Sequence, residues 1–131
     1  MTDAARILVV DDDRVVRQSV ARVLAQEGHQ VDQAGSGAEA VQVLEAGRYA
    51  LVILDLRMPR LGGLTVLQHV RHRHPEIPVL VMTGFPTLEN AKETIQLGAF
   101  EFLQKPLDAA QIRTVVARAL DSGSLTNGQR C

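Results

Sequence analysis

The stretch Ile7-Leu8-Val9-Val10-Asp11-Asp12-Asp13 decides the fold, because a run of four aliphatic residues passes directly into three acids. The aliphatic residues do not alternate with polar ones, as they would in a strand with one face in water. A continuous run of this kind is typical of a strand that is covered on both faces, as in a parallel sheet. We therefore predict a buried strand that ends at a cluster of carboxylates.

Two more aliphatic runs have the same character, at 51–54 and 79–82, and weaker strand candidates lie at 30–34 and 101–104. Between them, apolar residues recur at helical spacing and are bounded by capping residues and by glycine or proline stops. The predicted helices lie within residues 13–28, 36–46, 64–75, 87–98 and 108–120. Strands that alternate with helices five times make an α/β chain of the (βα)5 type. Right-handed crossovers then require a doubly wound parallel five-stranded sheet with helices on both faces.

The composition is that of one ordinary globular domain. The 131 residues are 46% hydrophobic and 22% charged, which suffices for a buried core and excludes a largely disordered chain. The 14 basic and 15 acidic residues give a net charge of −1, which argues against direct nucleic-acid binding. We expect one domain at residues 1–121, followed by a flexible tail or truncated linker at 122–131.

The chain carries no sign of export or of membrane insertion. Its one cysteine, Cys131, can make no internal disulfide. No apolar stretch approaches the roughly 20 residues of a membrane span, and the first apolar run is too short for a signal peptide. We therefore expect a cytoplasmic protein.

Polar residues that follow the predicted strands define the candidate site. In open α/β sheets, ligands bind beyond the carboxyl ends of the strands. Those ends deliver Asp11 to Asp13, Asp55, Thr83 and Lys105 to one rim. Neighbouring carboxylates repel by about 4 kcal/mol at 4 Å and an effective dielectric of 20, so a cation must offset them, and hard oxygen ligands suit Mg²⁺. A divalent ion beside a carboxylate, an ammonium and a hydroxyl makes a site for a phosphoryl group, for which an Asp could be the in-line nucleophile.

Four segments resemble the receiver domain of the two-component response regulators. They are Ile7 to Asp13, Leu54-Asp55-Leu56-Arg57-Met58-Pro59 with Gly63 following, Met82-Thr83-Gly84, and Lys105-Pro106. They occur in the order and spacing of that family, and the likeness covers about residues 5–121. The resemblance implies that residues 1–121 are a phosphoacceptor receiver domain with the flavodoxin-like fold of chemotaxis regulators, strand order 2-1-3-4-5, and a place in a bacterial phosphorelay.

The resemblance also implies a role for each acid. Asp55 is the phosphoacceptor, which takes its phosphoryl group from a histidine kinase or a histidine phosphotransfer protein. Asp11 and Asp12 form the acidic pair that binds Mg²⁺, Asp12 directly and Asp11 through water. Asp55 and the backbone carbonyl of Arg57 complete the implied metal ligands.

The remaining implied residues respond to the phosphoryl group. Thr83 donates its hydroxyl to that group and Lys105 pairs with one of its oxygens, aimed by an expected cis peptide to Pro106. When Thr83 moves, Phe102 turns inward, so both belong to the switch. The affected surface comprises helix 87–98, strand 101–104 and helix 108–120, where we expect an output domain, a partner protein or a homodimer formed on phosphorylation. Reversing a 1:99 population takes about 5.5 kcal/mol, so several charge-assisted contacts are required.

Some conspicuous residues have simpler interpretations. Asp13 is interpreted as a helix N-cap and Gly62-Gly63 as a flexible turn rather than a phosphate loop. The histidines His69, His72 and His74 lie at the end of a predicted helix, where cationic groups interact favourably with the helix dipole. They do not make a convincing zinc site, because no carboxylate or cysteine in the pattern completes one.

Three other functions compete with that of a regulatory phosphoacceptor. A phosphohydrolase of the haloacid-dehalogenase type needs a second acid two residues after the nucleophile, and Arg57 occupies that place. A flavodoxin-like cofactor binder needs a pair of aromatic rings, and the four aromatic residues suggest none. A scaffold that is never phosphorylated would not need the complete set of acids, threonine and lysine. We therefore expect no enzyme beyond intrinsic autophosphorylation and autodephosphorylation, the latter slow because Arg57 and Phe85 cannot position an attacking water.

Overall fold

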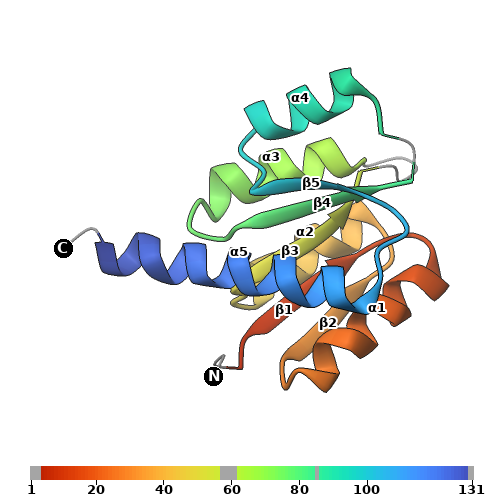
Figure 1. Ribbon diagram of the computed structural model, residues 1–131. Helices are drawn as coiled ribbons and strands as arrows, with labels where there is room; N and C mark the ends of the chain where they lie inside the picture. The colour runs from red at the N-terminus through yellow and green to blue at the C-terminus, as the bar shows by residue number, and fades with distance from the viewer. Residues whose placement is uncertain (1–3, 57–61, 85, 130–131) are drawn as a thin grey trace.

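The computed structural model describes residues 4–56, 62–84 and 86–129, and in these ranges five strands alternate with five helices (Figure 1). The strands are β1 (Arg6–Val10), β2 (Gln30–Ala34), β3 (Leu51–Asp55), β4 (Val79–Thr83) and β5 (Glu101–Gln104). The helices are α1 (Arg14–Gln26), α2 (Gly37–Ala46), α3 (Gly63–Arg73), α4 (Leu88–Gln96) and α5 (Ala109–Gln129). The strands pair in parallel in the order β2-β1-β3-β4-β5. The predicted doubly wound sheet is confirmed.

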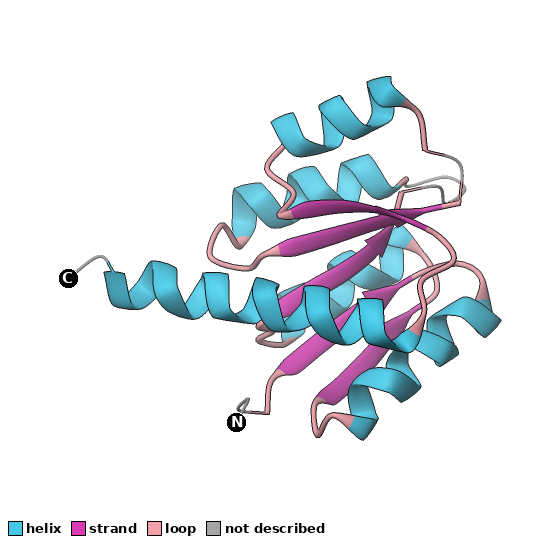
Figure 2. Ribbon diagram, viewed as in Figure 1, coloured by secondary structure: helices cyan, strands magenta, loops and turns pink. Residues whose placement is uncertain are grey.

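The sheet is the middle of three layers (Figure 2). Successive side chains of a strand point to opposite faces, because the strand repeat is two residues. Leu8 and Val10 of β1 therefore pack in one core with α2 and α3, while Ile7 and Val9 pack in a second core with α1 and α5. Strands β3 and β4 divide their residues in the same way. The aliphatic runs are continuous in sequence because both of their faces are buried.

The helix boundaries follow the local signals in the sequence. The predicted N-cap side chains accept hydrogen bonds from backbone N–H groups of the first helical turn, as expected for caps. They are Asp13, Ser36, Thr87 and Asp108. At two helix ends, Gly28 and Gly98 have φ of 90° and 100°, which glycine adopts without strain.

Helix α5 is longer than the sequence pattern predicts. It continues to Gln129, so residues 122–129 are helical where the polar composition predicts a tail. Gly123 and Gly128 each cost about 1 kcal/mol relative to alanine inside a helix, but both keep the backbone N–H that the next helical hydrogen bond needs. Neither α5 nor any other helix in the described ranges is both long and apolar enough to cross a membrane.

A hydrogen-bonded ion pair between Arg6 and Asp32 links β1 to β2, away from the acidic residues that follow β1. The Tyr49 hydroxyl donates to Asp32 Oδ2 at 2.6 Å, and Arg6 donates to the same oxygen from Nε at 3.1 Å and from Nη2 at 2.9 Å. The hydrogen bond from Tyr49, reinforced by Arg6, lowers the pKa of Asp32. Burial, with the Asp32 carboxylate beside it, raises the pKa of Tyr49 to about 12.

The ionisation of Tyr49 should therefore be visible in both absorbance and stability. Tyr49 is the single tyrosine and the chain has no tryptophan, so tyrosinate absorbance reports this group alone. We expect half-ionisation near pH 12 in the folded protein and near pH 10 in the denatured chain. A pKa that is raised by folding adds stability that is fully present below pH 10 and is lost as the pH rises through 12. We expect the free energy of unfolding to fall by about 2 kcal/mol in this window.

Tyr49→Phe removes the ionising hydroxyl and serves as the comparison. Denaturant unfolding of the variant should lack this step between pH 10 and 12, although the variant is less stable at neutral pH because Asp32 loses a hydrogen bond. Identical tyrosinate titrations of the folded and the denatured protein would contradict the prediction.

Candidate functional site

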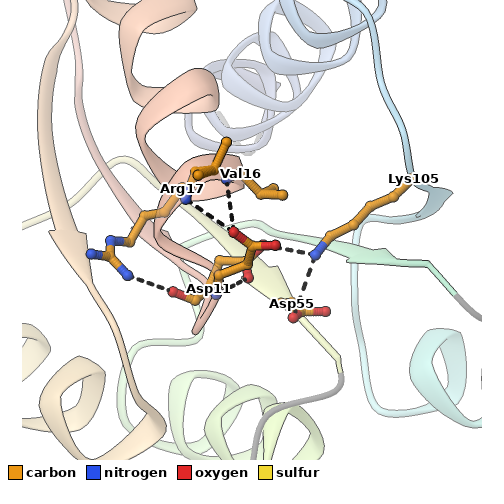
Figure 3. Close-up of polar contacts among 7 residues, drawn as sticks. Asp11, Val16, Arg17, Asp55 and Lys105 are labelled. Atoms are coloured by element: carbon orange, nitrogen blue, oxygen red, sulfur yellow. Dashed lines mark hydrogen bonds and ion pairs between the residues drawn. The ribbon is translucent and has the colours of Figure 1, made fainter.

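The carboxyl ends of four neighbouring strands bring the predicted site residues to one rim of the sheet. Asp11 and Asp12 follow β1, Asp55 and Thr83 are the last residues of β3 and β4, and Lys105 follows β5. The last residue of β1 is the register partner of the residue before Asp55. Asp11 and Asp55 therefore lie side by side, with Lys105 reaching them from the far side of β4 (Figure 3). The structure thus places these residues at one rim of the sheet.

Lys105 lies between two buried carboxylates. Its Nζ is 2.8 Å from Asp11 Oδ2 and 3.4 Å from Asp55 Oδ2, and the side chains of the two acids are only 0% and 6% exposed. Burial alone would lower the pKa of Lys105, but the hydrogen bond to Asp11 and the charges of Asp11 and Asp55 outweigh it and raise the pKa. Lys105 is therefore a permanent cation that balances one of the two negative charges. Its peptide to Pro106 is cis, as the resemblance implies.

Hydrogen bonds to neighbouring residues hold both the backbone and the side chain of Asp11. Its N–H donates to the Ala34 carbonyl at 3.1 Å, and its carbonyl accepts from Arg17 Nη1 at 2.9 Å. Its Oδ1 accepts the N–H of Asp13 at 2.9 Å. Sequence reasoning missed Arg17, because an arginine in the first turns of a helix is ordinarily a solvated residue. Arg17 also donates from Nε to Gln33 Oε1 at 3.1 Å, so its side chain bridges the ends of β1 and β2.

The acidic cluster has the donor set of a hard divalent cation. Asp11, Asp12 and Asp55 each offer a carboxylate oxygen, and these oxygens lie within 4.8 Å of one another. Asp12 is exposed, which leaves one side of the cluster open to water. Mg²⁺ prefers oxygen ligands and keeps several waters, so these residues fit it. The other predicted ligand, the Arg57 carbonyl, lies outside the described residues, as does Phe85.

Replacing Lys105 with methionine should tighten the binding of Mg²⁺ by about tenfold, which corresponds to about 1.4 kcal/mol. The ammonium occupies Asp11 Oδ2 and repels an incoming cation, and methionine of similar length removes both obstacles. Without a cation, the variant should be less stable than the parent, because two buried carboxylates then lack their counter-charge. Calorimetric titration with Mg²⁺ and denaturant unfolding with and without Mg²⁺ measure the two effects.

Lys92→Met is the matched control for this experiment. Lys92 is the other lysine of the chain and is exposed on α4, so its replacement should leave both quantities unchanged. Equal Mg²⁺ affinities for Lys105→Met and the parent would show that the ammonium does not oppose the cation.

Thr83 and Phe102 lie on the same face of the sheet, as a coupled movement of their side chains requires. Thr83 is fully buried, and its carbonyl accepts the N–H of Lys105 at 2.8 Å. Phe102 on β5 is the register partner of Val81, two residues before Thr83, and packs half-buried against the core that contains Val81. Residues two apart on a strand share a face, so Thr83 and Phe102 are diagonal neighbours on one face of the sheet. Their movement as a switch remains a prediction.

Gly63 corrects the interpretation of Gly62-Gly63 as a merely flexible turn. Gly63 is the buried first residue of α3, and its N–H donates to the Leu56 carbonyl at 3.2 Å. A Cβ at this position would overlap the carbonyl oxygen of Asp55 and would lie 2.7 Å from the Leu56 Cα. Glycine is therefore required because α3 begins in contact with the backbone that carries Asp55. A glycine pair in sequence does not reveal this approach.

The chain is similar to known regulatory proteins over nearly all of its length. The family model of the response regulator receiver domain matches residues 7–117. The response regulator protein FleR of Pseudomonas aeruginosa is 36% identical over 115 residues, which are 88% of this chain and 24% of FleR. The structure of NtrX from Brucella abortus matches with a TM-score of 0.93 and 35% identity, covering 98% of this chain and 29% of NtrX.

A second solved structure matches along nearly the whole of both chains. It is a CheY-like response regulator receiver domain protein from Methanospirillum hungatei, with a TM-score of 0.89 and 26% identity over 93% of this chain and 98% of that protein. The present chain thus spans about a quarter of the length of FleR and nearly all of the Methanospirillum hungatei protein.

Proposed function

Because the chain belongs to the response regulator receiver domain family, we propose that it accepts a phosphoryl group on Asp55 from a histidine kinase or a histidine phosphotransfer protein. The observation that carries the proposal is the environment of the Asp55 carboxylate. That carboxylate is nearly buried, lies 3.4 Å from Lys105 Nζ, and is within 4.8 Å of carboxylate oxygens of Asp11 and Asp12. The domain acts as a regulator, whose own chemistry is limited to accepting the group and slowly releasing it.

The transfer itself is an in-line displacement at phosphorus. An oxygen of Asp55 forms the new bond to phosphorus as the bond to the donor nitrogen or oxygen breaks, and the leaving group keeps the electron pair. The Lys105 ammonium moves from the carboxylates to the new phosphoryl oxygens, where it stabilises their charge. The Thr83 hydroxyl donates to another of these oxygens.

Mg²⁺ is the cation that this donor set fits. Asp11, Asp12, Asp55 and the carbonyl of Arg57 would hold it, and when bound it neutralises charge on the transferring oxygens. The three carboxylates together carry more negative charge than Lys105 balances, so without a cation they repel an anionic donor. Phosphoryl transfer is therefore expected to depend on Mg²⁺.

The signal leaves the domain through α4, β5 and α5. Thr83 follows the new phosphoryl group and Phe102 fills the space behind it, which changes this surface. Support for a partner here comes from α4, where Leu88 is 79% exposed and Ile95 is 49% exposed. The occupant is an output domain, a separate partner in the cytoplasm or a second phosphorylated copy, and no direct contact with nucleic acid or membrane is involved.

Incubation with acetyl phosphate tests the proposal. With Mg²⁺, the intact mass should rise by one phosphoryl group (about 80 Da), because a carboxylate nucleophile displaces acetate. Hydroxylamine should remove the group, as it cleaves acyl phosphates, and chelation of Mg²⁺ should prevent the adduct from forming. No adduct from acetyl phosphate or from a panel of phosphorylated histidine phosphotransfer proteins, or an adduct stable to hydroxylamine, would refute it.

A further inference from the structure

A second cluster of potential ligands lies at the opposite edge of the sheet from the acidic rim. His69 is in α3 and His74 caps the end of that helix, while Glu45 is in the last turn of the neighbouring helix α2. Helices run antiparallel to the strands in this fold, so their ends lie at the edge where the strands begin (Figure 1). The sequence around the histidines contains no carboxylate at a spacing that would complete a zinc site. Glu45, brought in by packing of α2 against α3, supplies it.

The three side chains converge on one point. Glu45 Oε2 is 3.3 Å from His69 Nε2 and 3.5 Å from His74 Nε2. Both of these nitrogen atoms are buried, and neither makes a hydrogen bond of acceptable geometry among the described residues. Arg73 donates to the other Glu45 oxygen at 3.0 Å and so leaves Oε2 turned toward the rings. Buried polar atoms are normally satisfied, so two unsatisfied nitrogens that face one carboxylate oxygen call for a shared partner.

The two distances from Glu45 Oε2 are close to those between adjacent ligands of a tetrahedral metal ion. Bonds of 2.0–2.1 Å from a tetrahedral Zn²⁺ place adjacent ligand atoms about 3.3–3.4 Å apart. The distances of 3.3 and 3.5 Å from Glu45 Oε2 agree with this value, and each of the three residues offers a ligand atom within 4.8 Å of the other two, so the histidine nitrogens need only approach each other around one ion.

We propose that Glu45, His69 and His74 bind one Zn²⁺ ion and thereby tie α2 to α3. Two imidazoles and one carboxylate suit zinc, whereas Mg²⁺ prefers oxygen ligands alone. The Glu45 side chain is 40% exposed, so the fourth position of the ion opens to solvent and takes a water. The site is separate from the acidic rim, which has only oxygen donors, and it does not rest on the proposed phosphoryl transfer.

Zinc titration of the untagged protein tests this site. Every protein carries Cys131→Ser, which removes the only thiol, and the buffer contains excess Mg²⁺ to occupy the acidic rim. We expect one equivalent of Zn²⁺ to bind by competition with a chromophoric chelator, and to raise the melting temperature, because the ion binds only the folded arrangement. Co²⁺ in place of Zn²⁺ should give the intense visible spectrum of a tetrahedral ion. His69→Ala, His74→Ala and Glu45→Gln should each weaken binding by at least about tenfold.

His72→Ala is the matched control, because His72 is an exposed histidine in the same helix turn. It should bind Zn²⁺ as tightly as the parent. The proposal is overturned if the parent binds no Zn²⁺, if His72→Ala loses as much affinity as His69→Ala, or if the bound equivalent survives in all three ligand variants. An equivalent that is lost only in Asp12→Asn would place the ion at the acidic rim and would likewise overturn it.

Discussion

Asp55→Asn should leave the protein folded but without a phosphoryl adduct, with incorporation reduced by at least about a thousandfold. Asparagine has the shape of aspartate but no anionic oxygen to attack phosphorus. The fold should tolerate the change, because Asp11 still pairs with Lys105 at 2.8 Å and one of two facing carboxylates has gone. Intact mass after incubation with acetyl phosphate and Mg²⁺ measures incorporation, and denaturant unfolding confirms that the variant is folded.

Asp13→Asn is the control for this result. Asp13 belongs to the same acidic run but is exposed and caps α1, and asparagine caps a helix equally well. This variant should accept the phosphoryl group as the parent does. An adduct that forms on Asp55→Asn at the parent's rate would move the nucleophile to Asp11 or Asp12.

Gly63→Ala should lower the free energy of unfolding by about 3 kcal/mol, because the added methyl overpacks a buried position. The added methyl would overlap the Asp55 carbonyl and would lie 2.7 Å from both the Cα and the carbonyl oxygen of Leu56. All of these atoms belong to the backbone, so relief requires α3 to move away from the end of β3. The displacement also shifts Asp55, so we expect slower phosphoryl acceptance in the fraction that stays folded.

Gly84→Ala controls for the loss of glycine itself. Gly84 also follows a strand at the rim, but among the described residues no atom outside its chain neighbours lies within 4 Å of the position its Cβ would take. Its replacement should change the free energy of unfolding by less than about 0.5 kcal/mol. If Gly63→Ala unfolds at the same denaturant concentration as Gly84→Ala, the close approach of α3 to β3 does not constrain the fold.

Features that depend on burial along a strand were predictable from the sequence. A strand covered on both faces must be apolar throughout, so the run before Asp11 identifies a central strand and also its end. Polar residues directly after such runs must lie at one rim, which is how Asp55, Thr83 and Lys105 could be placed together. N-caps were predictable because Ser36 and Thr87 accept hydrogen bonds from the first turn of the helix that follows them in sequence.

Features that depend on contact between two elements were not predictable. The requirement for Gly63 comes from the backbone of β3, which approaches it only after α3 has packed. Glu45 and His69 are 24 residues apart on different helices, and the hydrophobic periodicity of neither helix indicates that they are in contact. The end of α5 differs from the prediction for another reason: polar composition favours a tail, but residues 122–129 include no proline to stop the helix.

Apart from its bond to Lys105, three hydrogen bonds of Asp11 order the loop that a cation would contact. The loop after β1 is already ordered by Ala34, Asp13 and Arg17. Binding of an ion therefore removes little conformational entropy from the protein, and the ligands are preorganised. The attraction between cation and carboxylates is then opposed mainly by desolvation and by displacement of the Lys105 ammonium. Removing the Arg17 side chain would add to these an ordering term that grows with temperature.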